Sequence, residues 1–293
     1  MSASLRGLSE TKGLKLTRCV KSGAEAAVFE GRLGDRDVVL KKTVGNDAIK
    51  RSGAMVDELT AQYSHMADGP FRVPEPIVAL PAQKLVVMER APGLRLDHAI
   101  RADPSQRAAL LRRAGLWMSH YIGDRRVEDN FGGGYWIKTR RQAAHSLPTG
   151  PDRDKVSALI DIMEAERNTI GPRPITRVRS HGDFCTLNLI VNPDALWGVD
   201  IQNSHWLALA KDLARFLVYL EITLPHGTYD GPCGLSAEDC DALMGADGLI
   251  RDREAELMMP YFVATELSGR LMSETAHPEV LENARALADR ILS

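Results

Sequence analysis

The stretch from Ser180 to Gln202 constrains the fold of this chain more than any other part of the sequence. Asp183 is followed five residues later by Asn188 and then by a short apolar run. A turn at residues 192–194 and a second apolar run come next, and this second run ends in Asp200. Two short apolar runs joined by turn-forming residues predict a β-hairpin. The hairpin is expected to bring the three polar side chains to one end.

This set of side chains suits phosphoryl transfer from ATP to a hydroxyl group. One carboxylate can orient and deprotonate the attacking hydroxyl, while amide and carboxylate oxygens are hard ligands for the magnesium on the nucleotide phosphates. We therefore predict that Asp183 is the catalytic base and that Asn188 and Asp200 are magnesium ligands. A purely structural role, in which Asp183 caps a turn, is the weaker interpretation because the other two residues complete the set.

The segment His181-Gly182-Asp183 and the residues after it resemble the H-G-D…N…D pattern of the aminoglycoside phosphotransferase and choline kinase superfamily, small-molecule relatives of the protein kinases. The resemblance covers about residues 21–215. It implies a two-lobed, protein-kinase-like α+β fold. Residues 1–91 would form a small N-lobe with an antiparallel sheet that binds the nucleotide. Residues 92–293 would form a larger, mostly helical C-lobe with the catalytic loop and the acceptor-binding helices.

Under this resemblance the N-terminal strands hold the nucleotide. Ser22 and Gly23 lie where a phosphate-covering loop belongs, although a G-x-G-x-x-G pattern is absent and an ordinary hairpin turn explains this loop about equally well. The run Val38 to Lys41 resembles the V-A-I-K strand whose lysine contacts the α and β phosphates. Lys41 is preferred over Lys42 on the assumption that its face of the strand turns toward the nucleotide.

Two further parts of a nucleotide site are implied by the resemblance. A helix carboxylate should pair with Lys41, and both Glu58 and Asp57 qualify because helical spacing does not decide between them. The segment around residues 85–96 resembles the hinge strand and P-G-x-x-L turn of the superfamily. Backbone groups from Glu89 to Ala91 would then meet the adenine of ATP.

The link after Asp200 bears on the acceptor. Asp212 lies in a D-L-A sequence that resembles a helix start of aminoglycoside phosphotransferases, and it is expected to brace the catalytic loop. Only eleven residues separate Asp200 from Asp212, which favours a small hydroxylated acceptor over a peptide. Atypical protein kinases of the RIO and Bud32 types also lack the longer segment and stay an alternative. Gln202 stands where many relatives have an acidic residue, so a non-enzymatic pseudokinase is a third possibility.

The acceptor itself is not identified by the sequence. An acidic excess in residues 229–256 would suit a cationic acceptor, but a solvated surface explains the same charges better. Several aromatic or imidazole side chains can stack on a sugar or hold a cation, although packing is the better interpretation of each. These are Trp136, Trp206, Tyr219, His226 and Tyr229.

Periodicity and turn residues predict the elements around these motifs. We expect a hairpin of strands 26–32 and 36–42, a helix over 46–66, and helices over 105–122 and 154–168. Two helices should follow residue 253, divided near His277-Pro278.

Bulk properties narrow the partners. A net charge of -2 over 293 residues gives no long-range field for nucleic acid, and no apolar run approaches the roughly 18 residues of a membrane span. The four cysteines show neither a disulfide pattern nor metal-ligand spacing. We therefore expect a cytoplasmic enzyme with ATP and Mg2+ as cofactors, a small-molecule partner and no nucleic acid. Oligomeric state and the choice between ATP and GTP do not follow.

Overall fold

The computed structural model describes residues 13–201, 205–273 and 277–293 of the chain. Its internal contacts divide these residues into two units. The first unit holds residues 13–94 and 190–201, and the second holds residues 95–189 and 205–293. The expected boundary after residue 91 falls close to the first division. Residues 190–201, which include Asp200, also belong to the first unit. A single boundary in the sequence does not predict this.

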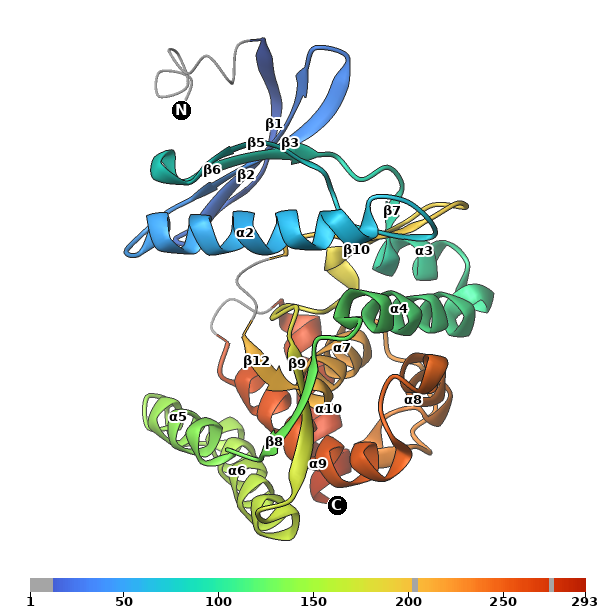
Figure 1. Ribbon diagram of the computed structural model, residues 1–293. Helices are drawn as coiled ribbons and strands as arrows, with labels where there is room; N and C mark the ends of the chain where they lie inside the picture. Colours follow the sequence, from blue (N-terminus) through green and yellow to red (C-terminus); the bar gives the residue numbers. More distant parts are fainter. Residues whose placement is uncertain (1–12, 202–204, 274–276) are drawn as a thin grey trace. The chain divides into compact units, whose positions relative to one another are not determined.

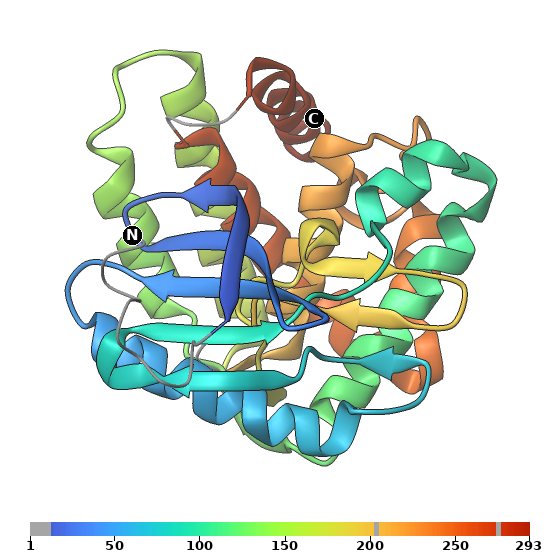
Figure 2. The same ribbon diagram turned by 90° about the horizontal axis from the view of Figure 1, so that it is seen from above.

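The first unit is built on an antiparallel sheet with the strand order β1-β2-β3-β6-β5 (Figures 1 and 2). The predicted hairpin is confirmed, and its two strands are joined at Gly34, whose φ of 61° lies in the left-handed region that favours glycine. The five strands are β1 (Leu14–Ser22), β2 (Ala26–Leu33), β3 (Arg36–Thr43), β5 (Pro76–Leu80) and β6 (Leu85–Glu89).

One face of this sheet carries a buried apolar cluster. Val38 and Leu40 of β3 pack there with Leu85 and Val87 of β6. Because successive side chains of a strand point to opposite faces, Lys41 lies on the other face. The alternation of β3 thus separates the residue predicted to contact phosphate from the apolar cluster.

The other large element of the first unit is α2 (Ala48–Met66), which follows β3 and confirms the helix predicted over residues 46–66. Figure 1 shows α2 running along one side of the sheet, and it packs against β3, β5 and β6. Met55, Leu59 and Met66 are buried at helical spacing. Glu58 lies beside this buried stripe and is half-buried, whereas Asp57 is exposed.

The predicted hairpin after Asn188 is also present. Strands β10 (Leu189–Val191) and β11 (Leu196–Gly198) form a four-stranded sheet with β4 (Phe71–Arg72) and β7 (Leu94–Arg95) in the order β4-β11-β10-β7. Oδ1 of Asn192 accepts hydrogen bonds from the backbone N–H groups of Asp194 and Ala195, at 2.9 and 2.7 Å. The turn is therefore closed by one of its own side chains, which is why neighbouring residues were enough to predict it.

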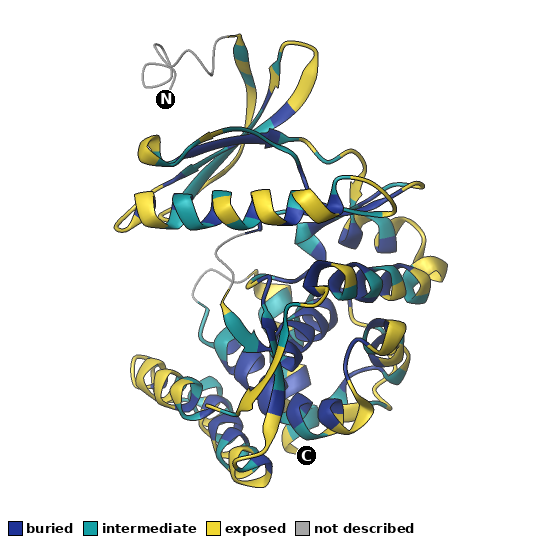
Figure 3. Cartoon of the chain, viewed as in Figure 1, coloured by how far each residue is buried: buried dark blue, intermediate teal, exposed yellow. Residues whose placement is uncertain are grey.

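The second unit consists of helices around a small sheet of strand order β12-β9-β8. Figure 3 shows that α7 (Leu209–Thr223) and α9 (Asp252–Leu271) are largely buried, and these two helices pack against each other. The strands are β8 (Arg126–Asn130), β9 (Pro174–Arg179) and β12 (Trp206–Ala208), and the other helices are α3 (Leu96–Ala102), α4 (Arg107–Ile122), α5 (Gly134–Ala144), α6 (Pro151–Ile170), α8 (Ala237–Met244) and α10 (Pro278–Leu292).

The helices predicted over 105–122, over 154–168 and beyond residue 253 correspond to α4, α6, α9 and α10. α5 begins at Gly134, the last of three consecutive glycines. No helix in the described ranges is long and apolar enough to cross a membrane. The sheet of the first unit and the helices of the second confirm the α+β class.

Candidate active site

In the first unit, Lys41 and Asp200 form an ion pair between Nζ and Oδ1. Their side chains are 12% and 27% exposed, so the pair is partly shielded from solvent. Asp200 has a φ of 59°, and a left-handed conformation in a residue other than glycine is uncommon and often found at functional sites. The ion pair joins two residues that the sequence selected separately. It also shows that the Lys41 face of β3 is the one that meets Asp200.

The helix carboxylate predicted to pair with Lys41 is Glu58 or Asp57 of α2. Glu58 accepts a hydrogen bond of 3.0 Å from Nε2 of Gln62, one turn later in α2. Its half-buried position favours it over the exposed Asp57 as the carboxylate that faces the sheet. The ion pair that the structure records for Lys41 is with Asp200, so pairing between Glu58 and Lys41 stays a prediction.

The predicted phosphate-covering loop is a short turn between β1 and β2. Ser22 pairs with Ala27 in the β1–β2 register, and the N–H of Gly23 donates to the carbonyl of Ala26 at 3.0 Å. The guanidinium of Arg51 donates to the carbonyl of Val44 and, at 3.5 Å, to that of Glu25 in this turn. Backbone bonds and one arginine thus hold the turn, and its role with a nucleotide stays a prediction.

The hinge segment follows β6. The N–H of Glu89 donates to the carbonyl of Glu75 at 2.9 Å, and that of Arg90 donates to the carbonyl of Asp37 at 3.1 Å. In the part of the chain that the structure describes, the N–H of Ala91 has no such partner. Ala91 is therefore the predicted adenine contact whose donor is left for a ligand.

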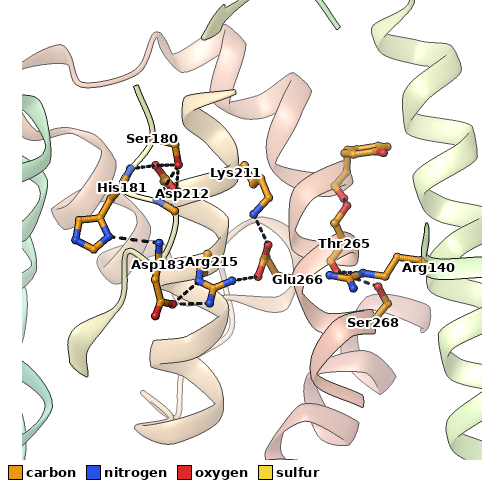
Figure 4. Close-up of polar contacts among 12 residues, drawn as sticks. Arg140, Ser180, His181, Asp183, Lys211, Asp212, Arg215, Thr265, Glu266 and Ser268 are labelled. Atoms are coloured by element: carbon orange, nitrogen blue, oxygen red, sulfur yellow. Dashed lines mark hydrogen bonds and ion pairs between the residues drawn. The ribbon is translucent and has the colours of Figure 1, made fainter. Parts of the chain in front are cut away.

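In the second unit, the buried carboxylate of Asp212 organises the loop that carries Asp183 (Figure 4). The hydroxyl of Ser180 lies 2.8 and 2.7 Å from the two carboxylate oxygens, and the N–H of His181 donates to Oδ2 at 3.1 Å. Gly182 continues the loop with a φ of 82° and donates its N–H to the Ser180 oxygen at 2.9 Å. These contacts confirm the predicted bracing role of Asp212.

The histidine of the H-G-D segment is a packing residue. His181 is buried, and its ring lies 5.8 Å from that of Trp117 and 5.7 Å from that of Tyr121. Its Nδ1 accepts a hydrogen bond of 3.3 Å from the N–H of Asp183.

Burial raises the pKa of Asp212 above its ordinary value, although hydrogen bonds from the loop oppose this shift.

The carboxylate of Asp183 is held by Arg215 of α7. Nε and Nη2 of the guanidinium both donate to Oδ1 of Asp183, at 2.9 and 2.5 Å. Within the described residues, no side chain donates to Oδ2. Nδ2 of Asn188 donates to the backbone carbonyl of Asp183 at 2.8 Å, which leaves the amide oxygen of Asn188 for another partner. The loop thus presents one carboxylate oxygen and one amide oxygen.

Arg215 is in turn part of a buried charge network (Figure 4). Glu266 of α9 is 5% exposed, and its two oxygens lie 3.0 Å from Nζ of Lys211 and 3.4 Å from Nη1 of Arg215. Burial alone would raise the pKa of Glu266, but Lys211 and Arg215 outweigh this and hold it below its ordinary value. Asp183 and Glu266 in turn raise the pKa of Arg215 in spite of its own burial. Arg215 and Glu266 are therefore both charged at neutral pH.

Sequence reasoning missed Arg215 and Glu266. A signal for Arg215 existed, because Lys211 and Arg215 lie four residues apart on one face of α7, the helix that also carries Asp212. Glu266 comes from a helix 51 residues further along the chain, and no spacing rule connects the two. Gln202 lies outside the described residues.

The predicted magnesium ligands suit that ion chemically. No cluster of three or more His, Cys, Asp or Glu side chains that could hold a metal ion occurs in the described ranges. Mg2+ commonly takes one or two protein oxygens and completes its octahedral shell with water and nucleotide phosphate. Asn188 and Asp200 provide hard oxygens of that kind, so the residues present fit the ion.

Most side chains considered for the acceptor have packing partners. Four of them contact other side chains of the second unit: Trp136 contacts Phe262, Trp206 lies under Arg179, Tyr229 lies under Arg290, and His226 pairs with Glu238. The acidic segment is similarly engaged. Asp239 forms an ion pair with Arg107 at 2.7 Å, and Asp230 accepts the N–H of Ala237. These contacts favour a structural role for the acidic excess.

No family model matches the sequence, and no curated protein matches it either. Solved structures match it over nearly the whole chain. A thermostable mutant of aminoglycoside phosphotransferase APH(4)-Ia, in a ternary complex with AMP-PNP and hygromycin B, has a TM-score of 0.66 at 12% identity, covering 99% of this chain and 97% of that one.

Two other solved structures match in the same way. A choline/ethanolamine kinase family protein from Mesorhizobium loti has a TM-score of 0.56 at 17% identity, with 98% and 97% of the two chains covered. Amicoumacin kinase hAmiN, in complex with AMP-PNP, Ca2+ and Ami, has a TM-score of 0.59 at 14% identity, with 95% and 88% covered. The chain therefore has the two-lobed fold of these kinases, as the sequence predicted.

Proposed function

We propose that this protein is an ATP-dependent phosphotransferase that moves the γ-phosphate of ATP to a hydroxyl of a small molecule. Asp183 acts as the base, and Asn188 and Asp200 hold the magnesium ion. Lys41 contacts the α and β phosphates. The fold supports this proposal, and the solved structures with that fold include two kinases crystallised with AMP-PNP.

The observation that carries the proposal is the contact between Asn188 and Asp183. The amide N–H of Asn188 donates to the Asp183 carbonyl, so the predicted metal ligand and the predicted base belong to one ordered loop. If Asn188 and Asp183 only closed a turn, there would be no reason for the amide oxygen of Asn188 to be left open. There would also be no reason for Arg215 to bind only one carboxylate oxygen of Asp183. The arrangement instead suits a loop that holds a general base, Asp183, next to a magnesium ligand, Asn188.

We infer different tasks for the two oxygens of Asp183. Arg215 occupies Oδ1 with two donors, which fixes the carboxylate plane. Oδ2 then orients the acceptor hydroxyl and takes its proton. Magnesium, when bound, neutralises the phosphate charge that develops during transfer. Asp212 acts indirectly, because it holds the backbone of the loop that carries Asp183.

The remaining nucleotide contacts follow the resemblance. Ser22 and Gly23 would cover the phosphates, and the N–H of Ala91, with the carbonyl of Glu89, would meet the adenine. Glu58 would orient Lys41 once a phosphate competes with Asp200 for its ammonium. Each of these contacts lies in the first unit, where backbone groups and one ion pair provide the binding surface.

A small acceptor is favoured over a protein. α7 begins at Leu209, nine residues after Asp200, which leaves no room for the long segment on which protein kinases bind a peptide. The solved structures with this fold are named as kinases of aminoglycosides, amicoumacin, choline or ethanolamine, and glucosamine. A protein acceptor or a nucleotide-binding role without turnover are the alternatives that the following experiment separates.

The test is Mg-ATP-dependent ADP release with a panel of amino sugars, sugars, amino alcohols and hydroxy acids, together with radiolabel transfer to lysate proteins. Asp183→Asn should lower turnover on any acceptor by about 1,000-fold, because proton transfer and orientation are lost. Stabilisation of this variant by Mg-ATP in thermal unfolding should be unchanged. Asp161→Asn, at an exposed position of α6, is the matched control and should keep full activity. Full activity of Asp183→Asn would show that Asp183 is not the base, and labelled protein alone would favour a protein kinase.

A further inference from the structure

The helix faces beside Asp183 carry more positive than negative charge. Lys211, Arg215 and Tyr219 follow one another at intervals of four residues and so share one face of α7. Glu266 and Arg270, also four residues apart, share a face of α9. The two faces meet, because Glu266 binds both cations of α7 and Arg270 stacks on Tyr219.

Arg270 of α9 contacts an aromatic ring of this surface. Its guanidinium carbon lies 5.0 Å from the centre of the Tyr219 ring, and its side chain is half-buried. In residues 13–201, 205–273 and 277–293, no carboxylate lies within ion-pair distance of Arg270. A guanidinium stacked on an aromatic ring is held with its edge donors directed outward, an arrangement that suits a planar or tetrahedral anion.

Tyr219 places Arg270 close to the catalytic loop. Burial raises the pKa of Tyr219, and the next contributions come from Cys185, two residues after Asp183, and from Arg270. Tyr219 also follows Arg215 by one turn on the same face of α7, Arg215 binds Asp183, and Arg270 stacks on Tyr219. Arg270 thus belongs to the same side of the second unit as the predicted base.

Arg140 adds to the surplus of charge. Its Nε donates to the carbonyl of Thr265 at 3.1 Å, and the described residues provide no carboxylate partner for it either. Burial lowers the pKa of Arg140, and Glu266, Arg215 and Arg270 all act on it electrostatically. Of the four cations of α5, α7 and α9, Lys211 and Arg215 form ion pairs with Asp183 or Glu266 in the described residues.

The acidic segment does not offset this surplus. Its members Asp239, Asp230 and Glu238 are engaged with Arg107, the backbone of Ala237 and a histidine. A cationic acceptor approaching the open oxygen of Asp183 would also meet Arg215 and Arg270, which oppose its charge. Like charges brought together in a partly buried site disfavour binding, whereas an anion gains from the same groups.

We propose that the acceptor carries a negatively charged group, a carboxylate or a phosphate, which Arg270 binds while the acceptor hydroxyl lies at Asp183. This inference rests on the proposed phosphotransferase function. The acceptor oxygen forms a bond to the γ-phosphorus as the bond from that phosphorus to the β-phosphate oxygen breaks. ADP leaves, and the hydroxyl proton passes to Oδ2 of Asp183.

The experiment uses four hexoses that differ mainly in charge: glucosamine, glucose, glucuronate and glucose 6-phosphate. Binding to the full chain is measured by calorimetry with Mg-AMP-PNP present, and phosphorylation by ADP release with Mg-ATP. Glucuronate or glucose 6-phosphate should bind about tenfold more tightly than glucose, and glucosamine more weakly than glucose, as expected for one partly buried charge contact. The two anions separate the carboxylate from the phosphate source.

Variants of Arg270 assign the preference to this residue. Arg270→Glu should remove the advantage of the anions and favour glucosamine, and Arg270→Lys should keep part of it because the charge is retained without the planar fork. Arg112→Glu is the matched control, since Arg112 is an exposed residue of α4, and it should keep the wild-type order. Thermal unfolding of each variant shows whether it folds.

Equal or weaker binding of both anions relative to glucose would overturn the inference, whether or not any sugar is phosphorylated. An anion preference that Arg270→Glu leaves intact would overturn the assignment to Arg270. Tight binding of an anion without any ADP release would support the anion site and count against the proposed phosphotransferase function, so the two failures are distinct.

Discussion

The two units hold their predicted functional groups in different ways. In the first unit, Lys41 and Asp200 are joined by a single ion pair whose members are both partly exposed. In the second unit, Asp183 and Arg215 are also partly exposed, but Arg215 contacts Glu266, which is 5% exposed and binds Lys211 as well. The strand register positions Lys41, whereas buried partners position Asp183.

This difference separates activity from stability. A partly exposed ion pair contributes little to folding because water screens it, so changes at Lys41 should affect catalysis with little effect on unfolding. A buried network loses much more when one partner is removed, because the remaining charges stay buried without compensation. Changes in the second unit should therefore affect both properties, and three variants examine this contrast.

Asp212→Ala should have the largest effect. It removes the acceptor for Ser180 and for the His181 N–H, and the free energy of unfolding should fall by about 4 kcal/mol. Denaturant unfolding measures the loss, and Asp161→Ala in an exposed position of α6 should change stability by less than about 0.5 kcal/mol. A small loss for Asp212→Ala would remove the distinction between the two units.

Lys41→Ala should lower kcat/KM for ATP by about 100-fold, the effect of losing one preorganised charge on the phosphates. Its free energy of unfolding should change by less than about 1 kcal/mol, because the ion pair with Asp200 is partly exposed. Lys42→Ala is the matched control on the opposite face of β3 and should keep near-wild-type kinetics. Equal loss of activity in both variants would refute the assignment to Lys41.

Glu266→Gln should lower the free energy of unfolding by about 2 kcal/mol at pH 7, since Lys211 and Arg215 lose their shared carboxylate. The pKa of Glu266 is held below its ordinary value of 4.5, so its contribution is present above that pH and is lost as the pH falls through the lowered pKa. Thermal unfolding between pH 3 and pH 7 should show wild type and variant converging in acid. A difference that is independent of pH would indicate a packing role instead of a charge role.

The sequence predicted the parts that depend on short-range patterns. The turn at Asn192 closes through its own side chain, and the β2–β3 hairpin turns at a glycine, so both follow from neighbouring residues. The bracing role of Asp212 came from resemblance and is visible in its bonds to the loop. Lys41 contacts Asp200, and Asp183 contacts Arg215. Their predicted roles in catalysis still require the experiments above.

The sequence alone determined the α+β class through a family resemblance, and it predicted Asp183, Asn188 and Asp200 as site residues because that prediction depends on local spacing and residue chemistry. Only the tertiary structure decided what surrounds them. Arg215 meets Asp183 across 32 residues of chain, and Glu266 joins them from α9, because helix packing brings these side chains together in the interior. No periodicity within a sequence encodes such contacts, and they set the charge that an acceptor meets at Asp183.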